Sequence, residues 1–165
     1  TRVIANAVLA SSWKNNIHVS HMKLQKLVFI LNGWSLANGA KLLHEPPQAW
    51  EFGPAYESIY FACHHYGTKN ITEHIKSMDC YSGKMSNLVP VQADKLFWQL
   101  MDGMIENYAK RDALELSAMC HAEGTPWHRA REEKLSEIPE QYIYEHYHSR
   151  LETNKLMQRL KSPSP

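Results

Sequence analysis

Residues 21–39 read HMKLQKLVFILNGWSLANG, and this stretch decides the fold. Its apolar residues recur at helical spacing and form one face: Leu24, Leu27, Val28, Leu31 and Trp34. Phe29 and Ile30 widen that face until little polar surface remains. Because a helix that is apolar nearly all round normally lies inside a bundle, the sequence predicts a central helix. Lys23 and Lys26, three positions apart, are expected on its one solvent-exposed side.

Helical spacing and start signals predict further helices around this segment. One precedes it at 2–13, and the apolar positions of 97–108 form another stripe. The remaining start signals are caps and prolines: Pro54, Asp112 with Glu115, Thr125 with Pro126, and Pro139. Residues 68–90 lack a strong period and are expected to form loops, with strand-like pieces at 70–75 and 87–91.

These elements predict a mainly α protein: a compact single-domain bundle of six or seven helices with a small extended or hairpin segment. A length of 165 residues suits one domain. The expected division is a helical domain at 1–148 and, at 149–165, a helical extension with a frayed tail.

Composition limits the functional classes. Eighteen basic residues against seventeen acidic ones give a net charge of +1, so no basic footprint for nucleic acid or an anionic membrane is present. The first two predicted helices resemble a helix-turn-helix, but the second is too apolar to read bases. Three cysteines without a CxxC pair indicate reduced thiols. No apolar run is long enough for a membrane span, so we expect a cytoplasmic protein.

Histidines and cysteines do not form a recognisable chemical site. His64 and His65 are adjacent and diverge on a helix, while Cys120, His121 and Glu123 lack zinc-ligand spacing. No nucleophile motif or phosphate loop is present. We therefore predict no metal, no cofactor and no catalytic residues. A hydrolase that uses Cys120 with His121 or Glu123 remains as an alternative.

The aromatic stretch QAWEFGPAYESIY at 48–60 is the strongest candidate for function. One interpretation places Trp50 and Phe52 in the core, with the chain turning at Gly53-Pro54. The other makes the aromatic side chains anchors for a protein partner. The predicted partner-binding residues include the central helix and a phase-shifted tail: Lys23, Gln25, Lys26, Trp50, Glu51, Phe52, Tyr56, Glu57, Leu156, Met157 and Leu160.

Three motifs in order resemble the Panacea domain of the SocA-like antitoxins, a phage-associated family. They are KLQKL at 23–27, AWEFGP at 49–54 and LSAMCHAEGTPWHRA at 116–130. The resemblance covers 3–148 and marks these residues as structural: Gly53, Pro54, His121, Pro126 and Trp127. His121 is expected to be hydrogen-bonded and Trp127 to be packed. Cys120 departs from the threonine of many relatives, and Ala55 from their valine.

The resemblance implies a helical, non-enzymatic bacterial or phage protein that neutralises a partner toxin by direct contact, alone or as an adaptor to a protease. An inhibitor of a host defence or regulatory complex is the alternative. Neither the partner nor the oligomeric state follows from the sequence.

Overall fold

The computed structural model describes residues 1–78, 85–87 and 95–161. The described residues form seven α-helices and a short 3₁₀ helix: α1 Arg2–Lys14, α2 His21–Ala37, α3 Glu57–Cys63, η1 His64–Tyr66, α4 Lys95–Asn107, α5 Ala113–His121, α6 Pro126–Glu132 and α7 Glu140–Lys161. Two antiparallel pairs of strands complete them: β1 Gln48–Trp50 with β2 Gly53–Ala55, and β3 Lys76–Met78 with β4 Met85–Asn87. The predicted mainly α fold is confirmed.

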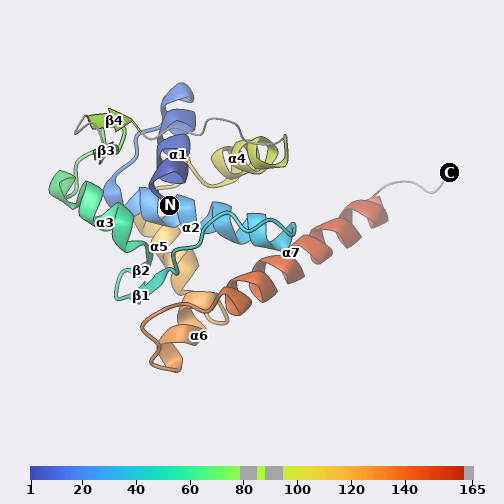
Figure 1. Cartoon of the computed structure of the whole chain (residues 1–165). Helices are drawn as coiled ribbons and strands as arrows, with labels where there is room; N and C mark the ends of the chain where they lie inside the picture. The colour runs from blue at the N-terminus through green and yellow to red at the C-terminus, as the bar shows by residue number, and fades with distance from the viewer. Residues whose placement is uncertain (79–84, 88–94, 162–165) are drawn as a thin grey trace.

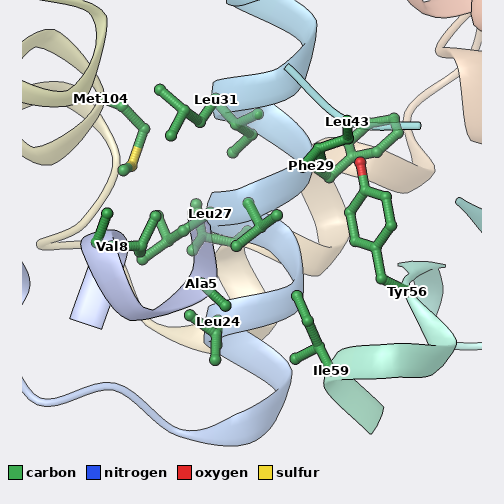
Figure 2. Close-up of a cluster of buried hydrophobic side chains, with 14 of the residues drawn as sticks. Ala5, Val8, Leu24, Leu27, Phe29, Leu31, Leu43, Tyr56, Ile59 and Met104 are labelled. Carbon is green, nitrogen blue, oxygen red and sulfur yellow. The ribbon is translucent and has the colours of Figure 1, made fainter. Parts of the chain in front are cut away.

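Helix α2 lies at the centre of the molecule and contacts α1, α3, α4, α5, α7 and β2 (Figure 1). Figure 2 shows its leucines meeting Val8 of α1, Ile59 of α3 and Met104 of α4. Ser20 caps its start by accepting a hydrogen bond from the backbone N–H of Lys23. The predicted central helix is therefore confirmed.

The solvent-exposed side predicted for α2 is wrong. Lys23 is 8% exposed and Lys26 only 2%, because β2 and α5 pack over the face that carries them. Their alkyl stems fit an apolar environment, but the ammonium of Lys26 needs a hydrogen-bond acceptor inside the protein.

Helix α7 packs its first half along α2 and then leaves the body of the molecule (Figure 1). Ile143 and Tyr147 are buried against the core, while residues 152–155 are exposed. The helix runs from Glu140 to Lys161 without a break. The side chains of Leu156, Met157 and Leu160 lie outside the described residues, so their predicted contact with a partner stays a prediction. None of the described helices has the length and apolarity that crossing a membrane requires.

Most predicted helix starts are confirmed. Asp112 and Glu115 form a complete capping box at α5, and Thr125 caps α6, which begins at Pro126. Pro54 is the exception, because it lies in β2 and α3 begins only at Glu57. Further along, β3 begins after the predicted strand-like piece at 70–75, and most of the piece at 87–91 lies outside the described residues.

The β1–β2 hairpin turns at Glu51 and Phe52, so the predicted turn at Gly53-Pro54 is displaced by two residues. Trp50 pairs with Gly53, and Gly53 has a φ of +96°, a conformation that glycine adopts without strain. A further segment pairs with β1 on its outer side. The N–H of Ala49 donates to the carbonyl of Ser136 (2.8 Å), and the N–H of Ile138 donates to that of Pro47 (2.8 Å).

Candidate functional site

Side chains from α2, α5 and α6 hold the backbone of the β1–β2 hairpin. They donate hydrogen bonds to four of its carbonyl groups: Lys26 Nζ to Pro54 (3.0 Å), Ser117 Oγ to Phe52 (3.1 Å), Trp127 Nε1 to Trp50 (2.8 Å) and Arg131 Nη1 to Ala49 (3.2 Å). We call these four side chains, together with Gln25, the hairpin clamp. Because these bonds tie the backbone of the hairpin to three helices, the clamp fixes the hairpin on the body of the protein.

Gln25 completes the clamp at the residue that follows β2. Its amide Nε2 donates to the carbonyl of Tyr56 (3.1 Å), and its Oε1 accepts from the N–H of Tyr56 (2.8 Å). The Tyr56 side chain is fully buried and extends toward Phe29 and Leu43 (Figure 2). Gln25, Lys26 and Tyr56, predicted to bind a partner, therefore lie beneath the surface and can only shape it.

His121 and Trp127 lie below Gly53. Their rings stack with centroids 3.9 Å apart, and a Cβ on Gly53 would lie 2.9 Å from Lys26 Nζ and 3.1 Å from His121 Nε2. Only glycine fits this point without displacing those side chains. The predicted hydrogen bond of His121 is missing at Nε2, which is buried and has no partner among the described residues. Burial, with a smaller effect of the Lys26 charge, lowers the pKa of His121, so its ring is neutral at neutral pH.

Burial also shifts the pKa values of Lys26 and Cys120. It lowers the pKa of the Lys26 ammonium to about 8 and raises the pKa of the Cys120 thiol to about 11. Cys120 is therefore a protonated thiol at neutral pH and a poor nucleophile. In the part of the chain that the structure describes, no three His, Cys, Asp or Glu side chains are grouped as metal ligands would be.

Above the clamp, the hairpin turn presents its side chains to solvent. Phe52 is 67% exposed and Glu51 is exposed beside it, so the interpretation of Phe52 as a core residue is wrong. Tyr56 is the aromatic residue of this stretch that fills the core, and Trp50 is half-buried. The difference follows from the turn position, since a residue at the tip of a two-residue loop has no core to enter.

Helix α3 extends this exposed surface. The Tyr60 ring lies at the centre of an aromatic cluster, with its centroid 4.9 Å from Trp50, 5.6 Å from Phe61 and 5.4 Å from His64. Phe61 is 67% exposed, Tyr60 is 36% exposed, and Glu57 lies one turn earlier. We call the following residues the hairpin-tip surface: Trp50, Glu51, Phe52, Glu57, Tyr60 and Phe61.

Sequence reasoning missed Tyr60 and Phe61 as surface residues. The helical spacing of Tyr56, Ile59, Tyr60 and Cys63 suggests one apolar face, but in the structure only Ile59 and Cys63 of α3 are buried. The available signal was Phe61, which lies off the stripe that Ile59 and Cys63 define by their spacing. A contiguous exposed apolar patch indicates a binding surface, and Phe61 adjoins Tyr60, which in turn adjoins Trp50.

The sequence model described as "Antitoxin SocA-like, Panacea domain" matches residues 24–128. This chain belongs to the SocA-like antitoxin family. It is similar to "Antitoxin SocA" of Caulobacter vibrioides (strain NA1000 / CB15N), with 28% identity over 127 residues that cover 76% of this chain and 67% of the relative. No solved structure matches the chain significantly.

Family membership confirms the resemblance found in the sequence, and the structure shows where the three motifs of this SocA-like chain meet. The first motif supplies Gln25 and Lys26, the second is the hairpin itself, and the third supplies Ser117 and Trp127. Separate in sequence, they form one structural unit, the clamped hairpin.

Proposed function

We propose that this chain is an antitoxin that neutralises a toxin by direct, stoichiometric binding, with no reaction carried out by its own side chains. The exposed Phe52 on a hairpin held from below carries this proposal. Keeping an apolar ring in water is unfavourable, and a rigid backbone lowers the entropy cost of binding at this point. The family and its relative, the antitoxin SocA of Caulobacter vibrioides, indicate the class of partner.

The binding mode is contact by side chains, because both edges of the hairpin are occupied. Residues 136–138 pair with the outer side of β1, and Lys26 and Gln25 bond the backbone along β2 and just after it. A partner strand therefore finds no open row of N–H and C=O groups to extend. The hairpin-tip surface offers aromatic side chains of the kind that dominate binding energy in protein interfaces.

Direct binding is tested by co-expression with the open reading frame that neighbours this gene. We expect that frame to arrest growth alone and the wild-type chain to restore growth. Phe52→Ala and Tyr60→Ala together should abolish rescue and weaken the purified complex by about 2 kcal/mol or more. Trp98→Ala on α4, which is also an exposed aromatic residue, should rescue as the wild type does. A harmless neighbouring frame, or full rescue by the double variant, would contradict the proposal.

Two further strains distinguish direct binding from hydrolysis and from delivery of the toxin to a protease. Cys120→Ala should still rescue growth, because the proposal gives the thiol no chemical role; loss of rescue by a folded variant would favour the hydrolase. Rescue in a host without its ATP-dependent proteases would show that contact alone suffices. If rescue required a protease, the chain would act as an adaptor instead.

A further inference from the structure

The exposed charged side chains of the hairpin-tip surface are carboxylates. Glu51 and Glu57 are exposed, and neither forms an ion pair with a described residue. The N-terminus of α5, whose Ser117 bonds the carbonyl of Phe52, carries the exposed Asp112 and Glu115, but the exposed Lys110 and Arg111 directly precede it, so the acidic charge of this face rests on Glu51 and Glu57. The chain as a whole is nearly neutral, so this face is acidic because of where its charges lie.

Four basic side chains that lie close to the hairpin are buried or engaged in other contacts. Lys23 and Lys26 are 8% and 2% exposed, and Arg131 is bonded to the carbonyl of Ala49, the middle residue of β1. His21 contacts the Tyr60 ring, and burial, followed by the neighbouring His64, lowers its pKa. It is therefore neutral at neutral pH. Glu51 and Glu57, the two carboxylates of the hairpin-tip surface, thus have no ion-pair partner among the described residues.

We infer that the hairpin-tip surface binds a basic amphipathic segment of the toxin, one that carries Lys or Arg beside apolar side chains. This inference rests on the proposed function. Phe52 and Phe61 expose apolar rings that cover the partner's apolar residues, and aromatic faces also attract guanidinium and ammonium groups. Glu51 and Glu57 form charge-assisted hydrogen bonds with the same cations. An acidic segment meets like charges at both positions and is rejected.

Synthetic peptides test this chemistry without the toxin. The probe is an amphipathic helical peptide of about 18 residues made of Leu and Lys, with matched peptides in which Glu or Gln replaces Lys. We expect the full chain to bind the Lys peptide with a Kd that rises between about 50 mM and about 200 mM salt. The Gln peptide should bind more weakly, and the Glu peptide should not bind.

Matched variants locate the binding. Glu51→Gln with Glu57→Gln should weaken binding of the Lys peptide about tenfold, and Phe52→Ala should weaken it further. Asp102→Asn with Glu106→Gln makes the same charge change on α4, across α2 from the hairpin (Figure 1), and should leave the Kd unchanged. An equal loss in both double variants would show nonspecific attraction and overturn the inference.

The inference is also overturned if the Lys peptide does not bind or if the Glu peptide binds equally well. A dimer of this chain that Phe52→Ala disrupts would overturn it too, because a second copy would then occupy the hairpin-tip surface. The two proposals fail separately. Peptide binding at Glu51 and Glu57 without growth rescue leaves the surface chemistry standing and removes the antitoxin role. If the Glu51→Gln, Glu57→Gln double variant restores growth as well as the wild type does, the antitoxin role stands and only the inference of a basic toxin segment is lost.

Discussion

Gln25 and Lys26 show how burial changes the meaning of a polar residue. On an otherwise apolar helix they resemble a solvent-exposed strip, yet both hold the backbone of the hairpin from below. The cost of burying their polar groups is offset because each group has a backbone partner. Their role is to hold the binding surface in place from within.

Gln25→Ala should therefore lower the free energy of unfolding by about 1–3 kcal/mol, since it leaves the buried N–H of Tyr56 without its partner. The C=O of Tyr56 loses one donor but keeps its hydrogen bonds from the N–H groups of Ile59 and Tyr60. Gln99→Ala on the exposed side of α4 is the control and should change stability by less than about 0.5 kcal/mol. Urea unfolding of both variants measures the difference. Equal stabilities of the two variants would mean that the hydrogen bonds of Gln25 contribute nothing to the stability of the fold.

Lys26 also makes a pH-dependent contribution. Its pKa is about 8 in the folded protein against an ordinary 10.5, so the folded state binds fewer protons between these values. Its contribution to stability is complete only above 10.5 and is lost as pH falls toward 8. Raising the pH from 7.5 to 9.5 should therefore favour the wild type over Lys26→Met by about 1–2 kcal/mol. Thiols and tyrosines that titrate in this range are present in both the wild type and Lys26→Met, so their effects cancel in the comparison. Denaturant unfolding measures the two stabilities at each pH, and a stability difference that does not change with pH would contradict the argument.

At the scale of elements, the contact between α2 and α7 depends on one glycine. A Cβ on Gly33 would lie 2.2 Å from Cε2 of Tyr147, so the two helices approach as closely as they do only because no side chain intervenes. Tyr147 is buried, and its ring also meets those of Trp34 and Phe29 edge to face. Few rotations are open to it that would relieve a clash.

Gly33→Ala should destabilise the fold by about 1–3 kcal/mol through overpacking, despite the better helix propensity of alanine. Gly103→Ala in α4 is its control, because the added Cβ meets no described atom within 4 Å apart from its chain neighbours and the backbone of its own helix. That variant should gain about 0.5–1 kcal/mol. Thermal unfolding compares the two, and a stabilised Gly33→Ala would show that α7 does not pack against α2 in this way.

Across the whole molecule, histidines held neutral by the fold predict acid sensitivity. Burial, with a smaller effect of Arg150, lowers the pKa of His146 to about 4 from an ordinary 6.5, and the pKa values of His21 and His121 shift in the same direction. The unfolded chain binds more protons between pH 6.5 and 4, so stability is full above 6.5 and falls through this range. His146→Gln should show a shallower decline of the unfolding midpoint with pH. A curve as steep as that of the wild type would contradict the role of His146.

Local rules account for most of the fold. The all-round apolar helix, the capping box at Asp112 and the Thr125-Pro126 start each depend on neighbours in sequence, so they could be predicted. The site was predicted less well. The sequence left Phe52 open between the core and the surface; the structure exposes both Phe52 and Glu51 to solvent, and their contact with a partner stays a prediction. Gln25, Lys26 and Tyr56, also predicted to bind a partner, are buried, because the two segments that carry them, about 30 residues apart along the chain, pair with each other.

Sequence by itself determined the helical class, the central position of α2 and the family, because periodicity, caps and ordered motifs are written along the chain. Only the tertiary structure decided that three distant motifs form one clamp, that Phe52 points outward while Tyr56 fills the core, and that the lysines lie inside the acidic face. The physical reason is that burial and hydrogen-bond pairing belong to contacts between segments, and a side chain's exposure is fixed only when those segments pack.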